Sequence, residues 1–140
     1  MRQCGKLMNH QLTITVHPEL YAICRLEPQA GVPQWAAGGT SFLTISRTKT
    51  ELSIVCEEAR VPAEVHAERK RRLMQVAGTL AFSLTGILAA IAVPLAEAHI
   101  SIFGVSTYDT DYVLVQEADL ERAISVLESA GHAIQRIAGA

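Results

Sequence analysis

The sequence predicts an α+β fold in which short strands outnumber helices, and three observations support this prediction. The first is a long run, residues 73–96, that contains no charged side chain. The second is a pair of β-branched stretches, 42–47 and 51–57, joined by a short polar turn. The third is an amphipathic helical stretch, 119–130, near the C-terminus.

The uncharged run has two competing interpretations. About twenty apolar residues can span a bilayer, and the basic residues 69–72 just before the run suit a cytoplasmic flank. Small polar residues and glycine over 82–86, and then Pro94, interrupt the run. The two strands expected after it also need an apolar element to cover them. We therefore favour strand, loop and helix in a globular core over a membrane helix.

The first half begins with a loose polar lead-in over residues 1–10. Leu12, Ile14 and Val16 alternate with threonines, which predicts a half-buried strand. Pro18 is expected to end or bend this strand, because proline donates no ladder hydrogen bond. Extended structure over 21–26 is followed by a connection over 27–40 that is rich in proline and glycine and has one short turn around Trp35. Next come a hairpin (42–47 and 51–57) around Thr48, Lys49 and Thr50, and a short polar helix (62–70).

The second half repeats a similar order more clearly. Pro94 is expected to kink its first helix or to restart it after Val93, and Gly131 is expected to end its second. The expected elements are a strand (72–81), a helix (86–98), two strands (100–106 and 111–116) around a turn (108–111), a helix (119–130) and a last strand (132–137).

The order β-α-β-β-α-β is that of a ferredoxin-like unit. The first half resembles a copy in which the first helix has degenerated into residues 27–40. We therefore expect two ferredoxin-like units, 1–70 and 71–140, and an internal repeat of element order rather than of sequence.

The composition argues against several classes of function. The chain has 140 residues and a net charge of −2, so it carries no overall basic field for nucleic acid. Its three cysteines are odd in number and widely spaced, which suits a reducing compartment. The first ten residues lack the apolar segment of a signal peptide. We expect a cytoplasmic protein that binds neither nucleic acid nor membrane.

Motifs for catalysis and metal binding are weak. There is no G-x-S-x-G elbow and no P-loop. His66 and Glu68 have the H-x-E spacing of zinc deaminases, but no P-C-x-x-C follows. Asp109 and Asp111 are expected to serve as turn formers, and the basic residues 69–72 as a solvated helix end. We expect a protein that is not an enzyme and that needs no cofactor or metal.

One feature predicts a ligand site. Residues 82–86 join a strand to a helix N-terminus, whose first N–H groups have no internal partner and favour an anion. Gly86 would let a ligand approach closely, and backbone carbonyls and hydroxyls of 102–107 could hold an ammonium group. An ordinary strand–helix turn is the alternative. The candidate ligand-binding residues are Phe82, Ser83, Leu84, Thr85, Gly86, Ile102, Phe103, Gly104, Val105, Ser106 and Thr107.

The stretches 82–88, 94–98, 100–107 and 108–115 read FSLTGIL, PLAEA, ISIFGVST and YDTDYVLV. They resemble ACT-domain proteins of the CASTOR type, strongly over 78–132 and more vaguely over 11–61. The resemblance implies two ACT-like domains and amino-acid binding between domains. Ala81 departs from the family pattern, which has aspartate there, and this departure argues against arginine-like specificity.

The expected function is therefore that of a non-catalytic regulatory protein that binds a small amino acid, in a homodimer or larger homo-oligomer. The alternative is a structural or partner-binding ACT-like module with no small ligand. An enzyme is the third and weakest hypothesis.

Overall fold

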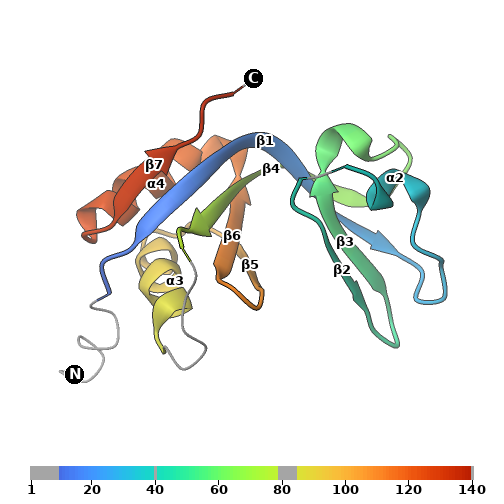
Figure 1. Ribbon diagram of the computed structural model, residues 1–140, viewed down its shortest axis with the longest axis horizontal. Coiled ribbons are helices and arrows are strands. Elements are labelled where there is room, and N and C mark those ends of the chain that lie inside the picture. The colour runs from blue at the N-terminus through green and yellow to red at the C-terminus, as the bar shows by residue number, and fades with distance from the viewer. Residues whose placement is uncertain (1–9, 40, 79–84, 140) are drawn as a thin grey trace. The chain divides into compact units, whose positions relative to one another are not determined.

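The computed structural model describes residues 10–39, 41–78 and 85–139, and the chain divides into two compact units. The larger unit joins Met1–Pro18 to Arg72–Ala140, and the smaller unit is Glu19–Arg71. Two strands, β1 (Thr13–Leu26) and β4 (Ala67–Val76), belong partly to each unit (Figure 1). The division expected from the sequence, 1–70 and 71–140, differs in its N-terminal strand. The first half of β1 belongs to the larger unit because it pairs there with β7.

The larger unit has the β-α-β-β-α-β order that the sequence predicts. After the end of β4 come α3 (Ile87–Glu97), β5 (Phe103–Ser106), β6 (Asp111–Gln116), α4 (Leu120–Ser129) and β7 (Ala133–Arg136), with a 3₁₀ turn (Glu117–Asp119) before α4. In a four-stranded ferredoxin-like sheet the last strand lies beside the first. Here β1 separates them, and the order is β7-β1-β4-β6-β5. The β1–β7 pair is parallel, with Thr13 opposite Ala133.

Both helices of the larger unit pack on one face of its sheet. Their apolar stripes form one cluster with alternate residues of β1, β4 and β6, since strand side chains alternate between faces. The predicted stripe of α4 is confirmed, with Leu120, Ala123, Ile124 and Leu127 all buried. The strand residues of this cluster are Ile14, Val16, Met74, Val76, Val113 and Val115, and Leu12 just before β1 joins them.

The smaller unit is a reduced version of the same arrangement. Its strands are the second half of β1, β2 (Thr44–Arg47), β3 (Leu52–Glu57) and the first half of β4, in the order β2-β3-β1-β4. The first helix is only α2 (Gln34–Ala37), and a 3₁₀ turn (Glu58–Arg60) replaces the second. The predicted degeneration of the first helix is therefore confirmed. Trp35 is partly buried and packs against this core.

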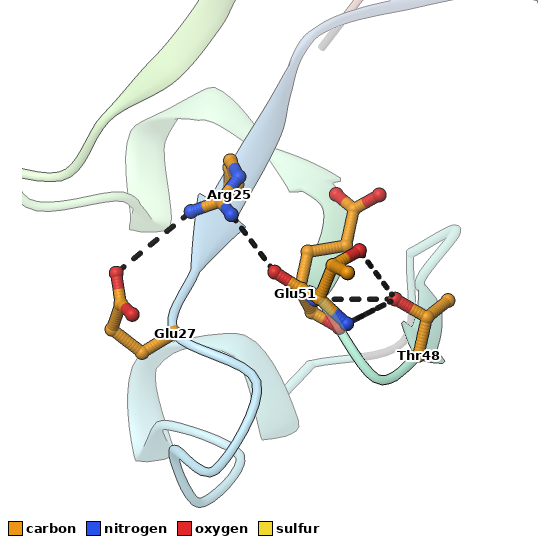
Figure 2. Close-up of polar contacts among 5 residues, drawn as sticks. Arg25, Glu27, Thr48 and Glu51 are labelled. Carbon is orange, nitrogen blue, oxygen red and sulfur yellow. Dashed lines mark hydrogen bonds and ion pairs between the residues drawn. The ribbon is translucent and has the colours of Figure 1, made fainter.

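The β2–β3 hairpin turns where the sequence predicts, and side chains hold it (Figure 2). Thr48 Oγ1 accepts hydrogen bonds from the N–H groups of Thr50 at 3.2 Å and Glu51 at 3.1 Å. Arg25 on β1 donates from Nη2 to the Thr50 carbonyl at 2.8 Å. The turn is thus linked to the neighbouring strand as well as closed on itself.

The predicted helix over 62–70 is wrong. Residues 62–66 form a turn and β4 begins at Ala67, so the basic residues lie in a strand. Their guanidinium groups bind backbone oxygens: Arg69 donates to the carbonyls of Pro62 and Val65, and Arg72 to that of His17. Lys70 has a positive φ of 57°, and its N–H donates to the Glu58 carboxylate at 2.6 Å. The longer-range contacts, from Lys70 to Glu58 and from Arg72 to His17, favour the strand over the predicted helix.

The uncharged run is divided between two elements. β4 ends at Val76, earlier than the predicted end at residue 81, and α3 has 11 residues. Such a helix is about 16 Å long, roughly half the thickness of a bilayer's hydrocarbon core. Across residues 10–39, 41–78 and 85–139, no helix has the length and apolar character that crossing a membrane requires. α3 also continues through Pro94 as one helix.

Both helices of the larger unit end in a Schellman motif. Ile100 N–H bonds to the Leu95 carbonyl at 2.9 Å after α3, and His132 N–H bonds to the Leu127 carbonyl at 3.1 Å after α4. The residue with positive φ is His99 (59°) in the first motif and Gly131 (101°) in the second. The predicted capping role of Gly131 is thus confirmed, and His99 occupies a position that favours glycine.

We expect His99→Gly to raise the free energy of unfolding by about 0.5–1 kcal/mol, because glycine adopts positive φ without a Cβ clash. Gly131→Ala should lower it by about 1 kcal/mol for the reverse reason. A Cβ at residue 131 would lie 3.8 Å from Gln11 Nε2, which is ordinary contact distance, so the change in stability should reflect the backbone conformation and not steric overlap. Urea denaturation of both variants measures the difference, and a destabilised His99→Gly would contradict the strain assigned to His99.

Candidate functional site

The start of α3 offers uncapped backbone donors. Gly86 lies just before the helix with φ 80° and ψ 3°, and no side chain of the described residues caps it. Ala90 N–H makes the first helical bond, to the Gly86 carbonyl at 2.9 Å. The three N–H groups before Ala90 therefore have no helical partner. Next to them, the Thr85 carbonyl bonds to His10 Nε2 at 2.8 Å.

Strand β5 lies beside the first turn of α3. A Cβ built on Gly104 would lie 3.8 Å from Leu88 Cδ2, so the absence of a side chain at Gly104 leaves the two elements close together. Gly104 pairs with Val113 of β6, which is buried beneath the helices. Gly104 is therefore on the face of the sheet that α3 covers. Figure 1 shows α3 in yellow and the β5–β6 hairpin in orange.

The N-terminus of α3 lies toward the far end of β5. A short connection joins the end of α3 to the start of β5, so the two elements run in opposite directions. Ser106 lies two residues beyond Gly104, so it is on the same face of the sheet, and it pairs with Asp111 across the hairpin. Ser106 Oγ donates to Asp111 Oδ1 at 2.6 Å. A hydroxyl and a carboxylate thus lie on the α3 side of the sheet, toward the end where α3 begins.

The structure brings together only some of the candidate residues. Gly86, Gly104 and Ser106 share the region between α3 and β5. Phe103 and Val105 pair with Leu114 and Tyr112 on the opposite face of the sheet. Three other candidates lie apart from this region: Thr85 is exposed before α3, Ile102 packs against the core, and Thr107 lies in the hairpin turn. The candidates Phe82, Ser83 and Leu84 lie outside the described residues, as does Ala81.

Asp111 is a residue of this region that the sequence analysis expected only to form a turn at the start of a strand, and not to belong to the site. It is the first residue of β6, and its partner in the register is Ser106. The turn beside it is anchored by Thr110, whose buried hydroxyl donates to the Val76 carbonyl at the end of β4 at 2.9 Å. The alternation of Asp111 with buried Val113 and Val115 is the signal that could have placed Asp111 on the helix side.

Groups suited to other chemistry lie elsewhere. Cys24 and Cys56 are buried on adjacent strands of the smaller unit, although they are distant in sequence. Their thiols hydrogen-bond, which, together with burial, raises the pKa of Cys56 and keeps it protonated. Among residues 10–39, 41–78 and 85–139, no three or more His, Cys, Asp and Glu side chains are grouped to hold a metal ion.

The α3–β5 region contains both backbone donors and side-chain acceptors. Backbone N–H groups at the positive end of a helix attract a carboxylate. The Asp111 carboxylate and the Ser106 hydroxyl, on the neighbouring strands, can accept hydrogen bonds from an ammonium group. Gly104 places no side chain between them.

Two family models match the chain in consecutive segments. A model described as an ACT domain matches residues 67–129, which run from β4 to the end of α4. A model of an N-terminal domain matches residues 19–64, which lie within the smaller unit. The boundary between the two models thus lies just before β4.

Three relatives show how far the similarity extends. The structure of protein Atu0741 from Agrobacterium tumefaciens is 36% identical, covers 93% of this chain and 96% of its own, and superimposes with a TM-score of 0.87. The human cytosolic arginine sensor for mTORC1 subunit 1 is 43% identical over 51 residues, which are 36% of this chain but only 16% of the sensor. The regulatory subunit of aspartate kinase from Thermus thermophilus shares the fold, with a TM-score of 0.55 at 13% identity over 82% of this chain and 93% of its own.

Proposed function

The chain belongs to the ACT domain family, and from this premise we propose that it is a non-catalytic regulatory protein that binds a small free amino acid as its effector. The observation that supports this proposal most directly is the α3–β5 region. There, uncapped helix N–H groups and the Asp111 carboxylate flank a glycine strand. The likeness to an arginine sensor over 51 residues supports the same class of ligand.

Each part of an amino acid has an assigned partner in this proposal. The α-carboxylate binds the first N–H groups of α3, next to Gly86. The α-ammonium binds Asp111 and Ser106. Gly104 adds no side chain of its own, so the ligand backbone can approach strand β5 closely. The ligand's side chain points away from these groups. The described residues of this region therefore determine that the ligand is an amino acid, and residues around the ligand's side chain determine which one.

Thermal unfolding with each of the twenty amino acids tests the proposal. A ligand that binds only the native state at 100 times its Kd stabilises the protein by about 2.7 kcal/mol, which raises the Tm by several degrees. We expect one amino acid or a small chemical group of them to raise the Tm at millimolar concentration. The matched controls are the N-acetyl and methyl ester forms of the same amino acid, each of which removes one charge.

The result of this screen distinguishes the two functional hypotheses, an effector-binding protein and a module without a small ligand. A shift that requires both free charges supports a zwitterion site. A flat response to all twenty amino acids would contradict effector binding and favour the structural or partner-binding module. A shift that persists with the N-acetyl form would contradict the role of Asp111.

We also propose that the protein acts in the cytoplasm. Cys24 and Cys56 are free thiols although their side chains are in contact, which a reducing compartment would maintain. Labelling of thiols in freshly lysed cells, before any reductant is added, would show whether both are reduced.

A further inference from the structure

Two cysteines share the core of the smaller unit. Cys24 lies on β1 and Cys56 on β3, and the two residues are only 1% and 2% exposed. The register pairs Ala22 with Cys56 and Cys24 with Ile54, so the cysteines are diagonal neighbours across this strand pair. Both belong to the same core cluster, so their side chains lie on one face of the sheet. The fold thus brings together two thiols that are distant in sequence.

The two thiols are not equivalent. The Cys56 thiol donates a hydrogen bond to Cys24 Sγ, and Arg69 places a positive charge near Cys24; both effects lower the pKa of the Cys24 thiol. The same hydrogen bond, together with burial, raises the pKa of Cys56, which keeps its proton. Arg69 is held in place because it donates to the carbonyls of Pro62 and Val65. Cys24 is therefore the better nucleophile of the pair, since the thiolate is the form that reacts.

The cover over these thiols is thin. On the helix side of the sheet the core is closed by α2, which has only four residues and contributes Ala36 to the cluster. A helix of one turn has little stability of its own, and segments with few buried contacts open locally at a small cost in free energy. Val32, just before α2, is 43% exposed. A small oxidant can therefore reach the thiols by local opening, without unfolding of the whole unit.

We propose that Cys24 and Cys56 form an oxidation site, at which a small peroxide converts the two thiols into a reversible disulfide. The Cys24 thiolate attacks one peroxide oxygen, the O–O bond breaks, and the leaving hydroxide takes up a proton and becomes water. The sulfur of Cys56 then attacks the sulfenic acid on Cys24. The S–S bond forms, the S–O bond breaks, and the hydroxyl leaves with the Cys56 proton as a second water. The two thiols lose two electrons and the peroxide gains them.

The diagonal placement favours a bond that is easily reduced again. Diagonal neighbours in a sheet are farther apart than directly opposite residues, whereas the Cα atoms of a relaxed disulfide lie within about 6.8 Å of each other. The two strands must therefore be drawn together at Cys24 and Cys56, and the resulting strain makes the bond more reducible. The thiols thus stay reduced in a reducing compartment until peroxide is present. This inference does not depend on amino-acid binding, because it concerns other residues in the other unit.

A movement at Cys56 is transmitted to α2 through the next residue. Glu57 Oε1 accepts a hydrogen bond from Ser41 Oγ at 2.7 Å and lies 3.8 Å from Arg60 Nε. Arg60 Nη1 in turn donates to the Trp35 carbonyl at 3.5 Å. Trp35 is the only tryptophan of the chain, and it packs against the core that holds both cysteines. Its fluorescence therefore reports on the state of the thiols.

Treatment of the reduced full chain with hydrogen peroxide tests this proposal. We expect a peptide map of the product to contain Cys24 linked to Cys56. Trp35 emission should fall as the link forms, because a disulfide quenches a nearby indole, and dithiothreitol should reverse both changes. Cys4→Ser removes the third thiol of the sequence and is the matched control, so it should react like the unmodified protein.

Two further variants distinguish the roles of the two thiols. Cys56→Ala should stop the reaction at a sulfenic acid on Cys24, which dimedone traps, whereas Cys24→Ala should give neither the link nor a trapped acid. Circular dichroism melts of the reduced variants check that each is folded, and the unmodified chain decides the question where a variant is not. Both thiols remaining free at millimolar peroxide would overturn the proposal. A bond that includes Cys4, or unchanged Trp35 emission on oxidation, would do the same.

Discussion

Replacing His132 with alanine is expected to lower the free energy of unfolding by about 3 kcal/mol. The imidazole is only 5% exposed, and both of its nitrogens bond to the backbone. Leu12 N–H donates to Nδ1 at 3.1 Å, so the ring proton resides on Nε2, which donates to the Ala90 carbonyl at 3.0 Å. Alanine would leave one backbone donor and one backbone acceptor without these partners, and it would also leave a cavity.

The bond from His132 also explains how α3 continues through Pro94. Proline has no N–H, so residue 94 cannot make the helical bond to the Ala90 carbonyl. His132 Nε2 supplies the missing donor from beyond the end of α4. A residue distant in sequence thus satisfies the carbonyl that Pro94 leaves without its helical partner, and α3 is not interrupted there.

A double-mutant cycle tests this link. Pro94→Ala restores an N–H to the helix, so His132→Ala should cost about 1–2 kcal/mol less in that background than in the unmodified protein. His132→Gln is the conservative control, because its amide has both an acceptor and a donor and should recover part of the loss. Guanidinium denaturation of the four members of the cycle gives the coupling. Strictly additive effects would show that Pro94 and His132 act independently.

Local signals predicted the larger unit well. The amphipathic stripe of α4, the cap at Gly131 and the β5–β6 hairpin all follow from residues near one another in sequence, where helix and turn preferences act. The predicted α+β class and the β-α-β-β-α-β order are confirmed for the same reason. The ends of elements were less certain, as the early end of β4 at Val76 shows.

Tertiary contacts decided the features that the sequence did not reveal. Pro18 suggested a break, yet β1 continues through it, because its two halves pair with different partners, β7 and β3. The stretch 62–70 looked helical, yet Glu58 and the carbonyls of the preceding turn hold Lys70 and Arg69 in a strand. The strand pairs of β1 and the contact between Lys70 and Glu58 join residues that are far apart in sequence.

The candidate site shows the same limit. Residues 102–107 were all predicted to line one site, but successive side chains of a strand point to opposite faces of its sheet. Only Gly104 and Ser106 of β5 face α3, and Asp111 joins them from the next strand. The pairing register was needed to see this carboxylate.

Asp111→Asn is expected to weaken binding of the effector amino acid by about 10- to 100-fold. Hydrogen bonds to charged groups contribute about 1.5–3 kcal/mol, and each 1.4 kcal/mol is a tenfold change in Kd. The amide keeps the size of the side chain and an acceptor for Ser106, so the fold should be preserved. Isothermal titration with the amino acid found in the thermal screen measures the effect. Ser106→Ala should weaken binding less, because it removes one neutral hydroxyl.

Gly104→Val tests the space between β5 and α3 without altering charge. Gly104 does not have the positive φ of Gly86, so a side chain there causes no backbone strain, and its Cβ meets Leu88 at an ordinary 3.8 Å. Valine should therefore be accommodated by a shift of the Leu88 side chain, yet block the approach of a ligand to β5 and weaken binding at least tenfold. Gly31→Val is the matched control, because it adds the same side chain where no atom lies within 4 Å of the new Cβ. Unchanged affinity in both Asp111→Asn and Gly104→Val would place the effector site elsewhere, whereas loss in Gly31→Val as well would point to a general effect on the fold.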